Sequence, residues 1–102
     1  MPKGILYVET RPLPGHEEEY QKWYDEVHIP EMVAFDGFVS ARRFAPVDEG
    51  GTFIAIYEMD ADDLEAAQAQ LTEASRAGRT SDSSGLGPNP TRTLRRHRST
   101  TR

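Results

Sequence analysis

The chain has 102 residues, the length of one domain, and carries a net charge of −5 at pH 7. It contains no cysteine, which excludes disulfides and thiolate chemistry and is typical of a reducing compartment. No apolar run approaches the ~20 residues that cross a bilayer. No secretory signal is readable either, so we expect a cytoplasmic protein without a membrane partner.

Segment 4–11 predicts the first strand, because β-forming residues alternate there and the run stops at Pro12-Leu13-Pro14-Gly15. Successive side chains of a strand point to opposite faces of the sheet. One face therefore carries Leu6, Val8 and Thr10, and the other carries Ile5, Tyr7 and Glu9.

A helix is predicted from residue 15 or 16 to residue 27, with three glutamates in a first turn where the helix dipole favours negative charge. Pro30 is expected to end this helix, since the residue before a proline is pushed out of the α region. The same proline suits the first position of a short second helical piece that reaches residue 35, before a turn at Asp36-Gly37.

Strands at 38–45 and 52–59 are predicted to form a hairpin joined by the turn-rich segment 46–51. In the first of these strands, alternation places Phe38, Ser40, Arg42 and Phe44 on one face and Val39, Ala41, Arg43 and Ala45 on the other. In the second strand it separates Ile54 and Ile56 from Phe53, Ala55, Tyr57 and Met59.

A second helix follows, with Asp60 or Asp62 as the N-cap and Gly78 as the C-terminal cap. A narrow apolar stripe at helical spacing predicts the side that it buries. The stripe consists of Leu64, Ala67, Leu71 and Ala74.

The C-terminal part offers little for a core. Residues 80–89 are rich in Ser, Gly and Pro, which predicts a loop. Segment 91–97 has Leu94 as its one strong apolar residue, so we expect either a short edge strand or no strand there. The prediction is therefore a single domain over residues 1–98 and a disordered tail over residues 99–102.

The β-α-β-β-α-(β) order predicts an α+β, ferredoxin-like subunit with an antiparallel sheet. One sheet face would stay apolar and uncovered, so a homodimer is expected. Charge is uneven, because residues 1–75 hold five cations and sixteen acids, a net −11, whereas residues 76–102 hold seven arginines and one acid, a net +6. Nucleic acid is not expected as a partner, because the basic tail has no aromatic residue to stack on a base.

The segment 23–30, with Tyr24, His28 and Pro30 in a Tyr-x3-His-x-Pro pattern, carries the most specific signal. Together with Gly37-Phe38, Arg42-Arg43 and the order of elements, it resembles the EthD-like branch of the dimeric α+β barrel superfamily. The resemblance covers residues 4–75, whereas the loop and tail depart from the family's last strand. Relatives in that branch include methylmuconolactone isomerase, small-ring polyketide cyclases and cofactor-free monooxygenases, so shared fold does not fix the chemistry.

The resemblance implies that His28 is the site histidine and that Trp23 and Tyr24 are its aromatic partners. From the residues alone, His28 has two interpretations: an acid/base or substrate anchor near pH 7, or a helix-terminal residue whose proton the dipole favours. Tyr20, Tyr24 and His28 share one helical face, and Trp23 and both tyrosines fit a core as well as a pocket.

Arg42 and Arg43 are adjacent on a strand, so one of them must face the helices. That inward arginine forms an ion pair, with Glu9 or Glu58 as partner, or binds a carboxylate or phenolate. Two further phenols, Tyr7 and Tyr57, lie on central strands.

No metal site is expected, since Asp25 lies on a different helical face from His28 and Pro30 disturbs the geometry around Glu31. No cofactor is expected either, because phosphate-binding glycine loops and Rossmann fingerprints are missing from the sequence.

These observations predict a cofactor-independent enzyme that performs cyclase, isomerase or lyase chemistry on a small ring or polyketide-like compound. His28 would move the proton, Tyr24 or Tyr57 would donate a hydrogen bond to a developing enolate, and Arg42 or Arg43 would hold an anionic oxygen. Two alternatives stay open: a cofactor-free monooxygenase of a phenol, and a non-catalytic ligand-binding or stress-related barrel protein.

Overall fold

The computed structural model describes residues 3–76, 87 and 90–101. The elements in chain order are β1 (Lys3–Thr10), α1 (Glu17–Trp23), the π-helical turn η1 (Tyr24–His28), α2 (Ile29–Val33), β2 (Phe38–Phe44), β3 (Phe53–Asp60), α3 (Leu64–Arg76) and β4 (Thr91–Arg96).

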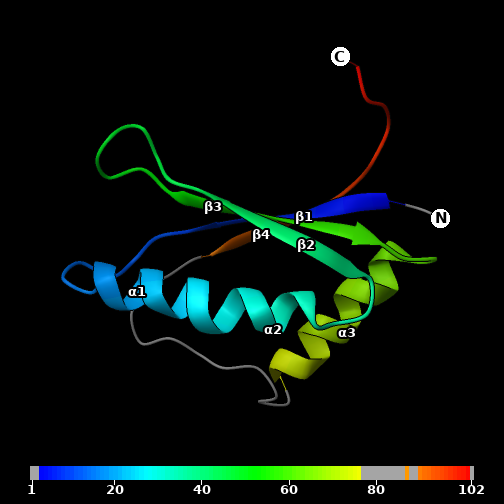
Figure 1. Ribbon diagram of the computed structural model, residues 1–102, viewed down its shortest axis with the longest axis horizontal. Helices are drawn as coiled ribbons and strands as arrows, with labels where there is room; N and C mark the ends of the chain where they lie inside the picture. Colours follow the sequence, from blue (N-terminus) through cyan, green and yellow to red (C-terminus); the bar gives the residue numbers. More distant parts are fainter. Residues whose placement is uncertain (1–2, 77–86, 88–89, 102) are drawn as a thin grey trace.

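The four strands form one antiparallel sheet in the order β2-β3-β1-β4. The helices lie together on one face of this sheet (Figure 1). The predicted α+β class with an antiparallel sheet is therefore confirmed, and the arrangement is consistent with a ferredoxin-like fold. The short last strand also forms, and it lies at the edge, paired with β1 from Gly4↔Arg96 to Glu9↔Thr91.

The core lies between the sheet and the helices. The predicted alternation of the two central strands is confirmed, and the structure shows which face is inward: Leu6 and Tyr57 are fully buried and Val8 and Ala55 almost so. The α3 stripe is buried as predicted, and it consists of Leu64, Ala67, Leu71 and Ala74. Burial of a large apolar side chain contributes about 1.5–3 kcal/mol, so these contacts hold the helices on the sheet.

Strand β2 contains an irregularity that corrects one predicted face. Phe38 pairs with Met59 and Ser40 with the next residue, Glu58, so the register shifts by one residue between them. Such a bulge moves the preceding side chain to the other face. Phe38 therefore points inward and is buried, although alternation placed it with Arg42 and Phe44.

The expectation that Pro30 ends the first helix is wrong. Ile29 has helical angles (φ −59°, ψ −49°), and the helix continues through α2. Pro30 lacks an N–H, and its ring crowds the carbonyl four residues earlier. Widening the preceding turn relieves this crowding, because the Ile29 N–H then bonds to the carbonyl of Tyr24, five residues back.

The start of α3 differs from the prediction in its cap. The Asp63 carboxylate, rather than that of Asp60 or Asp62, accepts a hydrogen bond from the Ala66 N–H at 3.0 Å. The predicted cap Gly78 and most of the predicted loop 80–89 lie outside the described residues. None of the described helices is long and apolar enough to cross a membrane.

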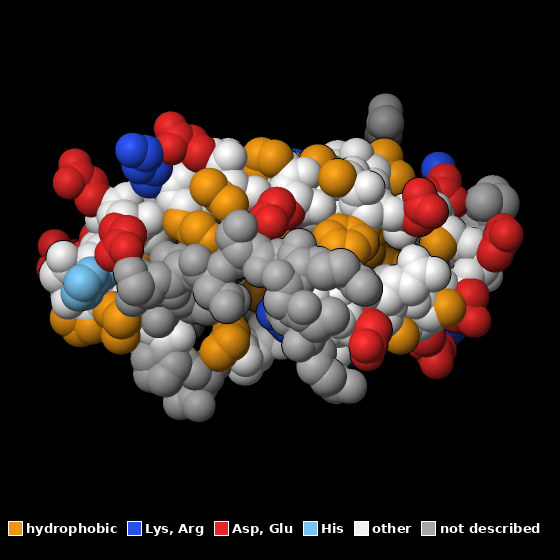
Figure 2. Space-filling model, turned by 90° about the horizontal axis from the view of Figure 1, so that it is seen from below, with side chains coloured by type: hydrophobic (Ala, Val, Ile, Leu, Met, Phe, Trp, Pro, Cys, Tyr) orange, Lys and Arg blue, Asp and Glu red, His pale blue; other side chains and the backbone are white. Residues whose placement is uncertain are grey.

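The helix side of the molecule and the open side of the sheet have different surfaces. The helix side, seen in Figure 2, carries acidic side chains along both ends and few lysines or arginines. None of the helices in the described part of the chain lies over the opposite side of the sheet (Figure 1). There Ile5, Ile54 and Ile56 are partly exposed, and Phe44 is 46% exposed.

Candidate active site

A cluster of rings lies between η1 and the centre of the sheet. The His28 imidazole stacks on the Trp23 indole, with centroids 4.4 Å apart and planes inclined by 17°. The rings of Tyr24 and Tyr57 contact the same imidazole in edge-to-face geometry, with centroid distances of 5.2 and 6.4 Å. Three elements, α1, η1 and β3, thus position one histidine among three aromatic rings.

The π-helical turn explains how Trp23 and His28 meet. In an α-helix of 3.6 residues per turn, side chains five positions apart point in different directions. The wider turn over Tyr24–His28 brings positions 23 and 28 closer in direction, so their rings can stack. The proline that widens the turn therefore also builds the site. Single π turns are frequent at functional sites.

Hydrogen bonds fix the two tyrosines of this helical face. The Thr10 hydroxyl at the end of β1 lies 2.5 Å from the Tyr20 hydroxyl and donates to the Tyr24 hydroxyl at 3.3 Å. The Tyr24 hydroxyl keeps its own proton for another acceptor. Thr10 is itself buried, so it anchors the helix to the sheet through polar as well as apolar contacts.

Arg43 is the inward-facing arginine. Its guanidinium carbon lies 4.4 Å from the centroid of the Tyr24 ring, a cation–π contact. Its Nη1 donates to the Asp25 carboxylate at 2.9 Å, and its side chain is only 15% exposed. The predicted inward ion pair therefore exists, but its acid is Asp25 rather than Glu9 or Glu58.

Two of the predicted site residues lie on the other face of the sheet. Arg42 pairs with Glu58 at 3.3 Å, with its side chain 65% exposed. Tyr7 donates to the Glu9 carboxylate at 3.0 Å, and this hydrogen bond, the largest cause, raises the pKa of the Tyr7 phenol. The structure thus brings together five predicted residues and separates Arg42 and Tyr7 from them. The five are Trp23, Tyr24, His28, Arg43 and Tyr57.

Four polar atoms of the cluster are buried without a hydrogen-bonding partner in the part of the chain that the structure describes. They are Trp23 Nε1, His28 Nδ1, Arg43 Nη2 and the Tyr57 hydroxyl. A buried polar group without a partner costs about 1–3 kcal/mol, so native proteins seldom retain one without a reason. Several such atoms around one imidazole are typical of a site that binds a polar molecule.

The environment keeps His28 neutral. Burial, followed by the charges of Arg92 and Arg43, lowers the pKa of His28 from 6.5 to about 4. Burial also raises the pKa of the Tyr24 and Tyr57 phenols, so both remain protonated at neutral pH. The interpretation of His28 as a helix-terminal residue with a favoured proton is therefore wrong, because the helix continues past it and its proton is disfavoured.

Sequence reasoning missed Arg92. The arginines of the last strand were assigned to an exposed edge, and Arg92 is exposed on the edge strand β4, but its pairing with Val8 also places it on the helix side of the sheet. Alternation within the strand was the available signal, since Arg92 shares its face with Leu94, the one apolar residue of the segment. Its charge acts on His28, Tyr24 and Tyr57.

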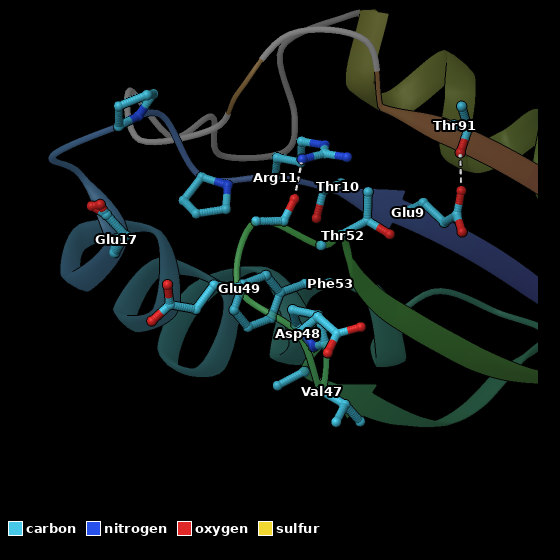
Figure 3. A pocket seen from close by; sticks show the side chains of 16 residues that line it. Glu9, Thr10, Arg11, Glu17, Val47, Asp48, Glu49, Thr52, Phe53 and Thr91 are labelled. Atoms are coloured by element: carbon cyan, nitrogen blue, oxygen red, sulfur yellow. Dashed lines mark hydrogen bonds between the residues drawn. The ribbon is translucent and has the colours of Figure 1, made fainter.

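A separate groove of about 810 Å³ lies between the β2–β3 hairpin and the end of β1 (Figure 3). The acids Glu9, Glu17, Asp48 and Glu49 line it, and Arg11 donates a hydrogen bond to the Gly50 carbonyl across it. This groove borders the ring cluster only through Thr10 and Phe53.

Among the described residues, no three His, Asp or Glu side chains gather as metal ligands would.

Replacement of Tyr57 by phenylalanine should leave the free energy of unfolding unchanged or raise it by about 1–3 kcal/mol, because it removes a buried hydroxyl without a partner. Tyr20→Phe is the matched control. Its hydroxyl contacts Thr10, so this variant should lose about 1 kcal/mol. Urea unfolding at pH 7 measures both. Equal destabilisation of the two variants would show that the Tyr57 hydroxyl is satisfied.

No family model, no curated protein and no solved structure matches this chain. The arrangement of its own residues therefore has to support any function proposed for it.

Proposed function

We propose that the protein is a cofactor-independent enzyme that transfers a proton on a small oxygen-bearing ring or polyketide-like compound. Cyclase, isomerase and lyase chemistry share this step. The observation that supports the proposal is a neutral imidazole, His28, whose Nδ1 lacks a partner beside the unpartnered hydroxyl of Tyr57. Such a pairing of a base with a hydrogen-bond donor fits the abstraction of a proton next to a carbonyl group.

The reaction would begin when His28 takes a proton from the carbon beside the substrate carbonyl. The electron pair of that C–H bond moves toward the carbonyl oxygen and forms an enolate. Tyr57 and Tyr24, both protonated, donate hydrogen bonds to this oxygen, and Arg43 supplies positive charge. The imidazolium then returns the proton to another atom, which regenerates His28. Trp23 holds the imidazole by stacking, and its indole ring would contact the substrate beside it.

The proposal includes membership of the EthD-like branch of the dimeric α+β barrels, as the sequence resemblance implies, and the cytoplasmic location expected from the sequence. The unpartnered Nδ1 of His28 supports a site that binds a molecule over a barrel closed by packed side chains, in which this ring would be fully satisfied by its neighbours.

Deuterium uptake from D₂O into a panel of carbon acids tests the proposal without knowledge of the product. The panel contains neutral 1,3-diketones, lactones and their carboxylate-bearing analogues, and NMR follows the loss of each C–H signal. We expect uptake above the buffer rate that requires His28. If no compound exchanges, the proposal fails. If a phenol instead consumes oxygen without added cofactor, the enzyme is a monooxygenase.

We also propose that two copies pair through the open faces of their sheets. Partly exposed Ile5, Ile54 and Ile56 form the apolar part of this face. Charges of both signs surround it, with Arg42 and Glu58 on the β2–β3 side. A two-fold axis brings identical patches together, so a patch with both apolar area and mixed charge can complement itself.

Light scattering at micromolar concentration should give twice the 11.5 kDa mass of one chain. Ile56→Glu should give the mass of a single chain, because it would bury an unpaired charge in the interface. Val47→Glu is the control, since Val47 lies at the hairpin tip with its side chain fully exposed. A single-chain mass for the unaltered protein would contradict the dimer.

A further inference from the structure

Two guanidinium groups act on the ring cluster from opposite edges of the sheet. Arg43 lies on β2 and Arg92 on β4, the two outer strands of the β2-β3-β1-β4 order. Both residues lie on the helix side, opposite Ala55 and Val8, which are buried. The strands that carry them are separated by three strand spacings, about 14 Å. The central strands β3 and β1 therefore lie between the two strands that carry Arg43 and Arg92.

The cations of this site are incompletely neutralised. Asp25 bonds to Nη1 of Arg43, whereas Nη2 is buried without a partner. Within the described residues, no carboxylate lies at ion-pair distance from Arg92. The charges that face His28 are thus Arg43 from β2 and Arg92 from β4, and the titratable rings that face it are Tyr24 from its own helix and Tyr57 from β3.

The unpartnered atoms also favour one kind of ligand. The Trp23 indole N–H and Nη2 of Arg43 can only donate hydrogen bonds, and the Tyr57 hydroxyl has a proton to donate. A ligand that satisfies them must be rich in acceptors, as a carboxylate or an enolate is. The rings that surround these atoms offer apolar faces to the carbon part of such a ligand.

We propose that Arg43 and Arg92 form a cradle for a small, flat organic anion, whose carboxylate or enolate oxygens accept hydrogen bonds over Tyr57. This inference rests on the proposed function, and it assigns to the site the class of anionic substrates.

The cluster reaches the protein surface on the side of Arg92, because Arg92 is exposed and Trp23 and His28 are only partly buried. Binding of an anion would offset the two positive charges that disfavour protonation of His28. The pKa of His28 would then rise, so the ligand itself would strengthen the base that acts on it.

Titration with benzoate tests the cradle, with the neutral isostere benzamide as the control ligand. The His28 ring signals in NMR spectra at pH 6 report both occupancy and protonation. We expect a saturable shift toward the protonated signals with benzoate and little shift with benzamide. Equal binding of the two compounds, or no saturable shift with benzoate at millimolar concentrations, would overturn the proposal.

The chain offers a matched control for each arginine. Arg92→Gln and Arg43→Gln should each weaken benzoate binding by roughly ten- to a hundred-fold, the usual effect of a lost charge-assisted hydrogen bond. Arg95→Gln and Arg42→Gln change the neighbouring arginine on the opposite face of the same strand, so they should leave the affinity unchanged within about two-fold.

Equal weakening by all four variants would mean that only the overall charge matters, which would overturn the cradle. Arg92 is exposed, so Arg92→Gln is expected to fold and decides the question if Arg43→Gln does not. The proposed function fails separately. Deuterium exchange in a neutral diketone without benzoate binding would refute the cradle alone, whereas benzoate binding without exchange in any carbon acid would refute the catalytic role alone.

Discussion

Replacement of His28 by glutamine should lower the rate of deuterium exchange by ~10²–10⁴-fold, the usual contribution of a general acid/base. Glutamine keeps a flat polar group beside Trp23 and Tyr57 but cannot accept a proton near neutral pH. With a neutral carbon acid as substrate, the unaltered protein should also keep its activity at pH 5, because the pKa of its imidazole is about 4 when no anion is bound. Below about pH 4 the rate should fall, since the base is then protonated.

The matched controls are His16→Gln and His97→Gln. His16 pairs with Glu19 on the surface, and His97 bonds to Thr100 beyond the end of β4. Neither ring contacts the cluster, so both variants should exchange at the unaltered rate. With a neutral carbon acid, a rate that declines near pH 6.5 in the unaltered protein would show that another group is the base. A His28→Gln variant with full activity would show the same.

The regular parts of this fold could be predicted because their burial follows a simple period. Alternation separated the two faces of β1 and β3 correctly, although it did not say which face is inward, and the stripe from Leu64 to Ala74 identified the buried side of α3. Each of these patterns arises because one side of a helix or strand faces the core, so the spacing of apolar residues along the sequence is enough to detect it. The edge strand β4 was expected for a different reason, because the ferredoxin-like order requires one more strand, and with Leu94 as the single apolar residue of its segment the sequence left open whether it forms.

The irregular parts depend on contacts between elements. The bulge in β2 follows from the pairing of Phe38 with Met59 on a different strand. The π-helical turn follows from Pro30 and from the packing that keeps the chain helical beyond it. Local rules predicted a break at that proline, because they do not include the buried contacts of Met32 and Tyr24 on either side.

The candidate site was predicted in part. The helical face and the resemblance identified His28, Trp23 and Tyr24, and one of two adjacent arginines had to face inward. Which arginine it was depended on the bulge. Arg92 is far from the others in sequence and reaches the cluster only through the pairing of β4 with β1, so local reasoning could not place it.

Acidification should lower the free energy of unfolding of the unaltered protein more than that of the His28→Gln variant. The difference should reach about 3 kcal/mol once the pH is below both pKa values of the imidazole. Above pH 6.5 the imidazole is neutral in both the folded and the unfolded chain, so it contributes no pH dependence. Between pH 6.5 and about 4, the His28 imidazole binds a proton in the unfolded chain but not in the folded protein. The free energy of unfolding therefore falls as the pH falls. The gap between the two pKa values sets the full size of the loss, which is reached below about pH 4.

Urea unfolding at pH 7 and at pH 4.5 measures this loss. Carboxylates also titrate in this interval, but they are common to both proteins and cancel in the comparison. The exposed His16→Gln variant should follow the unaltered protein, because it retains the buried imidazole. If His28→Gln and the unaltered protein lose the same free energy on acidification, then the His28 ring is solvated in the folded state. An imidazole of that kind would be protonated over much of the range in which the proposed base has to be neutral, so this result would count against both the enclosed site and its chemistry.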